Sequence, residues 1–224
     1  MILIIAGTAG FIKIGYDYFK ADQRYQISKE LYVAESNRVC ILRDTVSDRG
    51  NEGISQLQKI NRDVTGWLSI KSLELEYPIV KGEDNEFYLT HAYEGSESIG
   101  GSIMMNCDNS TDFSDRNTML YGHDMRDSSM FGSLKELVGR EESGVIAIQT
   151  AEEEKIYRIF CIAEVDQTDH IFQIESSVQE FIGDAKGLQS NALYWDERQI
   201  KHSEYFLTLI TCSNNKRLIV IGGK

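Results

Sequence analysis

Eight short apolar or alternating runs dominate the sequence after Gly66, and they constrain the fold more than any other feature. Turn-forming Gly, Asn, Asp and Ser residues separate the runs, and most connections lack a helical pattern. Such a series favours an antiparallel β-barrel or sandwich over a doubly wound parallel sheet, and this number of runs favours a closed sheet. The runs are WLSI, LELEYPIV, GGSIMMNC, NTMLYGH, GVIAIQT, KIYRIFCIAEV, YFLTLITC and RLIVIGG.

Two stretches between these runs have a helical pattern. The first is residues 129–138. The second lies between residues 176 and 188, inside a long insertion at 169–203. Insertions of this length more often shape a binding site than serve as plain connectors. The apolar positions of the second pattern recur every three to four residues and are Val178, Phe181, Ile182, Ala185 and Leu188.

The N-terminal part of the chain has a different character. Residues 1–19 form an apolar leader whose core, MILIIAGTAGFI, is shorter than the ~20 residues that a transmembrane helix needs. We interpret the leader as the remnant of a membrane anchor, with a signal-peptide core or a buried N-terminal helix or strand as alternatives. Residues 20–60 are expected to form a helical arm, with a polar joint at 47–55 and a short helical piece at 54–60. The main body is then expected over 61–224.

Composition and charge exclude several classes of function. Hydrophobic residues make up 42% of the chain, which is enough to build a core without disulfides or a structural metal. The 23 Lys and Arg residues are outnumbered by 35 Asp and Glu residues, giving a net charge of −12 that would repel a nucleic-acid backbone. No C-x-x-C pair or H-E-x-x-H sequence is present, and Asp108, Asp112 and Asp115 do not have EF-hand spacing. We therefore expect no metal or other cofactor.

A cysteine at the end of an apolar run is the first candidate for a nucleophile. Cys212 ends the run TLITC directly before polar residues, so a strand would present its thiol near solvent. His123 follows the run NTMLY and a glycine, and an imidazolium beside a thiol favours the reactive thiolate. The alternative for Cys212 is a small buried core residue, as most free cysteines are. No disulfide is required of the other cysteines, Cys40, Cys107 and Cys161.

A fixed positive charge follows the candidate nucleophile. Arg217 opens the last apolar run, and a tight turn would bring its guanidinium back beside the sulfur of Cys212, where it would stabilise a developing oxyanion. The alternative is an edge-strand arginine that faces water. The other histidines lack the strand-and-glycine setting and are interpreted as surface or packing residues; they are His91, His170 and His202.

Several motifs, in this order, resemble those of class B sortases. They are GWLSI, YPIVKGEDNEFYLTHAYEG followed by GGSIMMN, DRNTMLYGHDMRDSSMFGSLKEL, and TLITC before a final arginine-bearing run. The resemblance covers roughly residues 61–224, and the combination of N-T-x-x-Y-G-H, M-F-G-x-L and T-L-x-T-C is highly specific. It implies a mainly β fold with a closed eight-stranded sortase barrel, an N-terminal helical arm and a helix in the insertion before TLITC.

The resemblance also implies a function. The chain looks like a cysteine transpeptidase held by its N-terminal segment on the outer face of a Gram-positive cell membrane. Its implied partners are surface proteins with a C-terminal sorting signal of the Asn-Pro-x-Thr type and an amine of peptidoglycan. By this resemblance Cys212 is the nucleophile, His123 the acid and base, and Arg217 the clamp on the carbonyl and oxyanion. Tyr194 and Thr211 are the implied substrate-binding residues, although Tyr194 could equally pack the insertion onto the barrel. No metal or nucleic acid is implied, and we expect a monomer.

Two features depart from the family pattern. The connection from Cys212 to Arg217 is short, which could displace the arginine, and residues 213–215 supply no carboxylate to orient the histidine. Asp124 is the candidate substitute. Two alternative functions are a pilin-polymerising sortase that uses a lysine amine and a catalytically silent barrel that binds wall peptides. A papain-like hydrolase is disfavoured because its cysteine would precede its histidine, whereas His123 comes first here.

Overall fold

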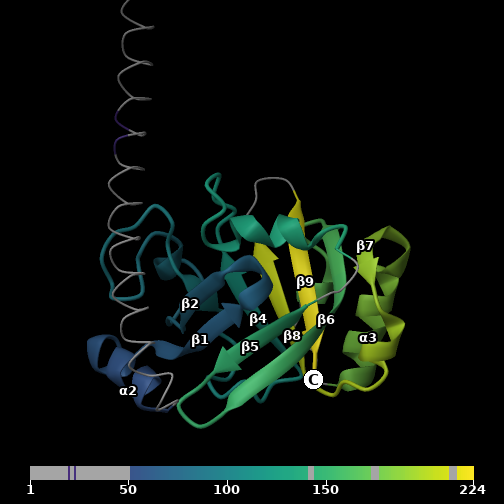
Figure 1. Cartoon of the computed structure of the whole chain (residues 1–224), viewed down its shortest axis with the longest axis horizontal. Helices are drawn as coiled ribbons and strands as arrows, with labels where there is room; N and C mark the ends of the chain where they lie inside the picture. The colour runs from purple at the N-terminus through teal and green to yellow at the C-terminus, as the bar shows by residue number, and fades with distance from the viewer. Residues whose placement is uncertain (1–19, 21–22, 24–50, 141–143, 173–176, 212–215) are drawn as a thin grey trace, which may run out of the picture. The chain divides into compact units, whose positions relative to one another are not determined.

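A computed structural model gives the fold of the chain (Figure 1). The structure describes residues 20, 23, 51–140, 144–172, 177–211 and 216–224. The chain forms two compact units, Met1–Leu42 and Arg43–Lys224. In the first unit the described residues, Lys20 and Gln23, are helical and exposed. The predicted leader and most of the predicted arm lie outside the described residues, so the rest of this description concerns the second unit.

In the described part of the chain, nine strands form one sheet, and eight of them close into a barrel (Figure 1). The order is β5-β1-β2-β3-β4-β8-β9-β6-β7, and an additional pairing between β5 and β6 closes the barrel. The prediction of a mainly β fold with a closed eight-stranded barrel is therefore confirmed, and each predicted run supplies one strand. The strands are β1 Val64–Ile70, β2 Leu75–Val80, β3 Ile103–Met105, β4 Asn117–Gly122, β5 Val145–Gln149, β6 Glu154–Val165, β7 Ala192–Trp195, β8 Phe206–Thr211 and β9 Arg217–Gly223.

The ninth strand, β7, was not predicted from the sequence. It has four residues and pairs antiparallel with the outer part of β6, through Cys161–Trp195 and Ile162–Tyr194. A strand this short carries too few residues for an alternation pattern, so tertiary pairing with β6 decides its conformation. It lies outside the closed barrel because β6 is long enough to pair with β5, β9 and β7.

Most strand pairs are antiparallel, but β2–β3 and β4–β8 are parallel. Pro78 of β2 faces Trp67 of β1, whereas the pairing of β2 with β3 begins only at Ile79. Pro78 therefore lies where β2 has an open edge, which suits a residue without a backbone N–H.

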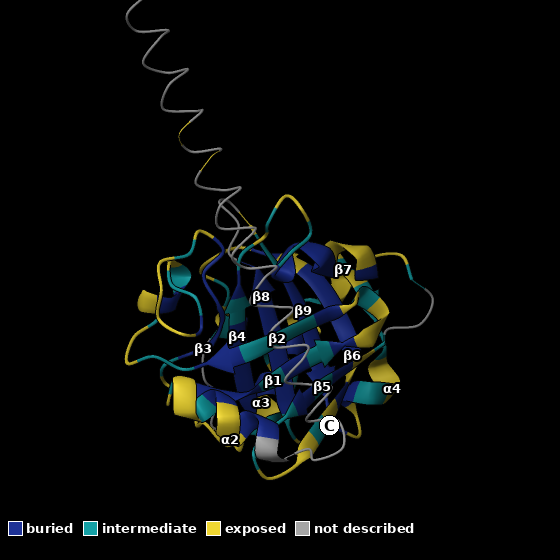
Figure 2. Cartoon of the chain, turned by 60° about the vertical axis from the view of Figure 1, so that its left-hand side comes forward, coloured by how far each residue is buried: buried dark blue, intermediate teal, exposed yellow. Residues whose placement is uncertain are grey.

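Strands β4, β8 and β9 consist mostly of buried residues (Figure 2). Every residue of β8 is buried, because one face lines the barrel interior and the other is covered by the insertion. This double burial explains why the run FLTLIT lacks apolar–polar alternation. An outer cluster joins β6, β8 and β9 to the insertion and includes Phe160, Phe181, Phe206, Ile219 and Ile221.

A helix precedes the barrel. This helix, α2 Asn51–Ile60, packs against β1 and buries Ile54 and Leu57. The sequence predicted a helical piece only from residue 54, with a polar joint before it. Because α2 begins at Asn51, Gly53 belongs to the helix rather than to the joint, and it is buried.

The insertion between β6 and β8 contains the predicted longer helix. The helix α3, Val178–Gly187, begins after Ser177, whose hydroxyl accepts a hydrogen bond from the Glu180 N–H and donates one to the Glu180 carboxylate. The Ser177 hydroxyl thereby satisfies the Glu180 N–H, one of the backbone donors that lack a partner within the helix. A short helix, α4 Glu197–Ile200, and two 3-10 turns, η4 His170–Phe172 and η5 Gln189–Asn191, complete the insertion. Among the described residues, no helix has both the length and the apolar character needed to cross a membrane.

The predicted helix at residues 129–138 is instead a 3-10 segment, η3 Phe131–Leu137. Met130, just before it, has φ 52° and ψ −126°, and Gly132 lies so close to Met125 that a Cβ would be 2.3 Å from its carbonyl oxygen. These tight contacts leave no room for a regular α-helical start. Two further 3-10 turns are η1 Lys71–Leu73 and η2 Phe87–Leu89.

Candidate active site

Strands β4 and β8 end at one rim of the barrel. They are parallel and in register from the Asn117–Phe206 pair to the Gly122–Thr211 pair. Parallel strands finish at the same edge of a sheet. The residue that follows β4 therefore lies at this rim, close to the end of β8. That residue is His123, which is half-buried. The sequence-predicted acid and base therefore lies beside the end of the strand that precedes Cys212 in the chain.

The ring of His123 is tethered to a backbone carbonyl. Its Nε2 lies 2.8 Å from the oxygen of Leu89, the last residue of η2. A carbonyl oxygen can only accept a hydrogen bond, so this contact requires the proton to be on Nε2. In the neutral ring, Nδ1 is then the basic nitrogen.

The backbone of His123 is also fixed. Its carbonyl oxygen accepts a hydrogen bond from Phe131 N–H at 3.0 Å, which closes the loop after β4. Gly122 permits this closure, because a Cβ there would lie 2.8 Å from the Phe131 ring and 2.6 Å from Ile103 Cδ1. The glycine before the histidine thus allows a close approach of two side chains of the same rim.

Tyr77 anchors the far end of the same loop. Its hydroxyl accepts a hydrogen bond from Met130 N–H at 2.8 Å. Burial raises the pKa of Tyr77 to about 12; the Met130 N–H opposes this rise and the Asp127 carboxylate adds to it. The phenol therefore stays neutral at physiological pH.

Arg217 and Thr211 lie together at this rim. The Nη1 of Arg217 donates to the Thr211 carbonyl oxygen at 3.4 Å, and Arg217 is half-buried. The side chain of Thr211 is 2% exposed, and its hydroxyl accepts from Leu218 N–H at 3.0 Å and contacts the Leu218 carbonyl oxygen at 3.3 Å. The hydroxyl of Thr211 thus joins β8 to β9, and the guanidinium lies next to the backbone of the residue that precedes Cys212 in the sequence.

Cys212 itself lies outside the described residues, as do residues 213–215 and Cys40. Of the other cysteines, Cys107 is half-exposed and Cys161 is buried in β6, and both are free thiols. Burial raises the pKa of Cys161 to about 12. Cys161 is therefore a core residue with no accessible thiolate.

Among the described residues, the polar partner of the His123 ring is the Leu89 carbonyl rather than a carboxylate. Asp124, the candidate substitute for a missing carboxylate, is exposed and has its Oδ1 3.9 Å from Lys135 Nζ. No sequence motif predicted the Leu89 contact, because a backbone carbonyl has no residue signature.

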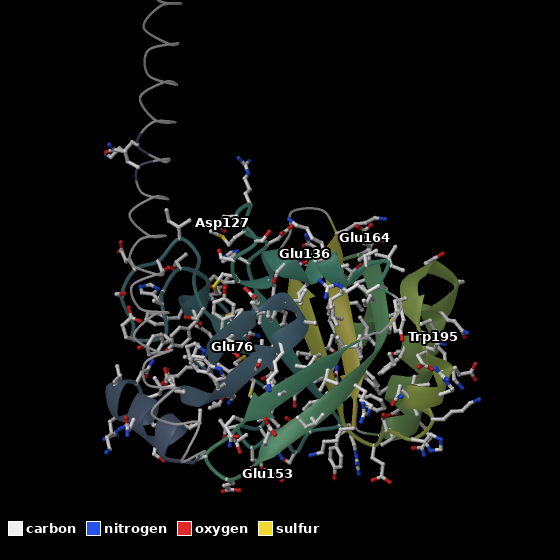
Figure 3. The ribbon with its side chains drawn as sticks, in the orientation of Figure 1. Glu76, Asp127, Glu136, Glu153, Glu164 and Trp195 are labelled. Carbon is white, nitrogen blue, oxygen red and sulfur yellow. The ribbon has the colours of Figure 1, made fainter. Side chains whose placement is uncertain are left out.

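Tyr194 belongs to β7, which the strand order separates from β8 by β6 and β9. It is half-buried and pairs with Ile162, whereas Arg217 pairs with Val165 of the same strand. The neighbouring Trp195 packs edge-on against Phe160, with ring centroids 5.8 Å apart (Figure 3). The described contacts thus fix β7 on the barrel but do not join Tyr194 to His123.

The remaining histidines do not approach this rim through any described contact. His91 stacks on Phe87 with ring centroids 4.0 Å apart, and its Nδ1 lies 2.8 Å from the Phe87 carbonyl oxygen. His170 and His202 are exposed. The interpretation of His91 as a packing residue fits these contacts.

Exposed carboxylates lie at this end of the barrel, together with exposed cations such as Arg126 and Lys135. Asp127, Glu136 and Glu164 are exposed and lie at the end of the barrel opposite the hairpin that carries Glu153 (Figure 3). A cavity of about 230 Å³ lies at that hairpin, lined by Gln58 and Glu153 among others, and contains none of the candidate residues. In the part of the chain that the structure describes, no three His, Cys, Asp or Glu side chains gather to hold a metal ion.

Comparisons with known proteins show which family the chain is similar to. The model of the sortase domain family matches residues 68–224. Sortase B of Listeria monocytogenes serovar 1/2a is 28% identical over 227 residues, which cover 96% of this chain and 89% of the relative. The Staphylococcus aureus sortase B-substrate complex superposes with a TM-score of 0.79 at 21% identity, covering 88% of this chain and 97% of that one. A Bacillus anthracis sortase B structure has a TM-score of 0.67 at 32% identity, covering 76% and 83%.

Proposed function

The chain belongs to the sortase family of cysteine transpeptidases, and from that premise we propose that it cleaves a C-terminal sorting signal of the Asn-Pro-x-Thr type after threonine and transfers the protein to a peptidoglycan amine. The resemblance to class B sortases found in the sequence is confirmed by these relatives. The observation that carries the proposal is the register of β4 and β8: Gly122 pairs with Thr211, and the residues next in sequence are His123 and Cys212.

The proposed reaction has two halves. The Cys212 thiolate attacks the threonine carbonyl carbon of the sorting signal, forming a C–S bond and an oxyanion. The oxyanion collapses, the scissile C–N bond breaks, and His123 gives a proton to the leaving amine. An incoming amine then attacks the thioester and gives a proton to His123, so a new C–N bond forms and the C–S bond breaks. Cys212 is regenerated, and no co-reactant besides the amine is consumed.

We propose that the Arg217 guanidinium binds the carbonyl of the substrate and stabilises the oxyanion. Its guanidinium is half-buried and already donates to the Thr211 carbonyl, so it lies at the backbone that leads into Cys212. A fixed cation with several N–H donors stabilises developing negative charge in such a position. This contact with Thr211 supports the assignment even though the connection from Cys212 to Arg217 is short.

Tyr194 is proposed to line the sorting-signal groove. Its β6 partner, Ile162, is three residues from Val165, the partner of Arg217, so the two positions are roughly 10 Å apart along β6. Because β6 lies between β7 and β9, they are also about 10 Å apart across the sheet. A pentapeptide laid across the rim spans such a distance. Thr211 is proposed to contact the substrate through its backbone, because its hydroxyl is engaged with Leu218.

The negative charge of the chain as a whole suits an amine as the second substrate. The chain has a net charge of −12, and Asp127, Glu136 and Glu164 lie at the same end as the site. Such a field raises the local concentration of a cationic acceptor. We place the enzyme on the outer face of the cell membrane, held by the apolar leader at residues 1–19, and propose surface proteins with sorting signals as its other partners.

Peptide cleavage with defined acceptors tests the proposal. Purified protein is incubated with a fluorogenic Asn-Pro-x-Thr peptide alone, and with diaminopimelate, oligoglycine or a lysine-bearing peptide. We expect cleavage that accelerates with a peptidoglycan-type amine, a transfer product detected by mass spectrometry, and a thioacyl adduct on Cys212. The Cys212→Ala variant should form neither product while keeping the circular-dichroism spectrum of the barrel, and His123→Ala should retain only a trace of activity.

The acceptor series also separates the alternatives. Transfer only to the lysine peptide would replace the cell-wall proposal with pilin polymerisation. Binding of the peptide without adduct or cleavage would favour a silent wall-peptide-binding barrel. Cleavage by Cys212→Ala at the wild-type rate would refute the assignment of the nucleophile.

A further inference from the structure

The Leu89 carbonyl that binds the His123 ring lies close to Gly101. We propose that Gly101 positions the Leu89 carbonyl, which in turn keeps a proton on Nε2 of His123 and leaves Nδ1 as the nitrogen that exchanges protons during the reaction. The kinetic part of this inference rests on the proposed function, whereas the tautomer can be measured without substrate.

The first step is the hydrogen bond itself. His123 Nε2 and the Leu89 oxygen are 2.8 Å apart, a normal distance for a hydrogen bond. In the neutral ring the bond fixes the Nε2–H tautomer, and in the imidazolium it persists while Nδ1 carries the extra proton. The proton that moves to and from substrate therefore belongs to Nδ1. The carbonyl fulfils the orienting role that a carboxylate has in other cysteine–histidine sites.

The second step is the rigidity of the turn that presents Leu89. The turn η2, Phe87–Leu89, begins at the Asp84 carboxylate, which accepts from the N–H groups of Glu86 and Phe87 at 2.9 Å each. Tyr88, 2% exposed, donates its hydroxyl proton to Asp63 at 2.7 Å. The Tyr88 bond ties the turn to the connection between α2 and β1, and the Asp84 bonds fix the start of the turn.

The third step is the close approach of Gly101. This residue has φ +55°, and a Cβ built on it would lie 2.5 Å from the Tyr88 oxygen and 2.6 Å from the Leu89 oxygen. Its neighbours hold it there: Ser102 N–H donates to the Tyr88 oxygen at 2.9 Å, and Ser98 N–H donates to the Thr90 oxygen at 2.8 Å. Any side chain at position 101 must push against the carbonyl that binds His123.

The same loop provides a matched control. Gly95 also has a positive φ, +92°, but nothing lies within 4 Å of a Cβ built on it. Gly101→Ala and Gly95→Ala therefore impose the same kind of backbone strain, and only the first displaces the Leu89 carbonyl. Gly101 is thus a positioning residue that acts on His123 through Leu89.

His91 provides an internal reference for the spectroscopic readout. Its Nδ1 lies 2.8 Å from the Phe87 oxygen, so its neutral form should have the proton on Nδ1. Two histidines bonded to carbonyls of the same turn are thus expected in opposite tautomers. Long-range ¹H–¹⁵N spectra of protein labelled at histidine distinguish the two forms, and a His123→Gln variant assigns the resonances.

The expected result is an Nε2–H tautomer for His123 in the wild type, lost or mixed in Gly101→Ala and unchanged in Gly95→Ala. With a cleavable sorting peptide, kcat should fall roughly 10- to 100-fold in Gly101→Ala with a smaller change in KM, because misplacement of a catalytic group by a fraction of an ångström to 1 Å has such an effect. The Gly95→Ala variant should remain within about twofold of wild type, since it touches none of the catalytic groups.

An Nδ1–H tautomer for His123 in the wild type would overturn the inference, and so would equal spectra and equal rates for the two glycine variants. If Gly101→Ala does not fold, the wild-type tautomer still decides, and Tyr88→Phe, which frees η2 from Asp63, should broaden or shift the His123 signal. The two proposals fail separately. A protein with the expected tautomers but no peptide cleavage would refute only the proposed function, and cleavage with the opposite tautomer would refute only this inference.

Discussion

Truncation of Phe181 should show how strongly the insertion stabilises the barrel. Phe181 lies in α3, is 0% exposed, and stacks on Phe206 of β8 with ring centroids 4.3 Å apart and an interplanar angle of 27°. Phe206 also packs edge-on against Phe160 of β6 at 5.9 Å. Phe181→Ala should therefore lower the free energy of unfolding by about 3–5 kcal/mol, of which the aromatic pair supplies roughly 0.5–1.5 kcal/mol. That is a large part of the roughly 5–15 kcal/mol that stabilises a typical protein.

Guanidinium unfolding followed by circular dichroism measures this loss. Because the cluster joins α3 to strands at the centre of the sheet, we expect the insertion and the barrel to unfold in one transition whose midpoint falls and whose slope is unchanged. Gly183→Ala is the matched control on the same helix: the position is exposed, a Cβ there meets nothing within 4 Å, and stability should rise by about 0.5–1 kcal/mol. A separate early transition of the helix, or a loss below about 1 kcal/mol for Phe181→Ala, would show that the barrel does not depend on this contact.

Three further predictions concern the rim and the core. Replacing Arg217 with lysine should lower kcat for sorting-peptide cleavage roughly 100-fold, because a lysine keeps the charge but loses the forked donors; turnover at the wild-type rate would remove Arg217 from the site. A thiol reagent at neutral pH should modify Cys107 in the native protein but not Cys161, whose pKa burial raises to about 12, and labelling of both at equal rates would contradict the burial of β6. The pKa of Tyr77 rises from 10.0 to about 12 on folding, so the native state binds the phenolic proton more tightly, and this contribution to stability is complete below pH 10 and declines as the pH rises toward 12. Unfolding measured across that range should show a shallower decline for Tyr77→Phe, and an identical pH dependence would refute the assignment.

Local sequence patterns were sufficient for the barrel strands because each strand is an apolar run between turn residues. The run from Lys155 to Val165 predicts a strand, and the structure extends it from Glu154 to Val165. The pattern does not show that this strand, β6, pairs with β5, β9 and β7, because pairing depends on contacts between distant segments. For the same reason β7 was missed. The 3-10 form of η3 also escaped prediction, because the apolar spacing does not show that Met130, just before it, has the non-helical dihedrals φ 52° and ψ −126°.

In the candidate site, too, some groups could be proposed from the sequence and others could not. His123 and Arg217 could be proposed from the sequence because their side chains have distinctive chemistry at strand ends, and the structure puts both at the rim where β4 and β8 end. The Leu89 carbonyl and Gly101 were not identifiable, since one is a backbone atom and the other contributes by having no side chain. Cys212 lies outside the described residues and stays a prediction.

The position of β9 has a consequence for the newly made protein. Arg217–Gly223 is the latest of the nine strands in chain order, yet it lies between β8 and β6. Until β9 has inserted, β8 and β6 each expose an unpaired edge, and the barrel stays open however much of the preceding chain has folded. Because closure also waits for contacts between remote segments, such as Thr208 with Asn117, we expect slow maturation and a nascent intermediate that chaperones must shield from self-association.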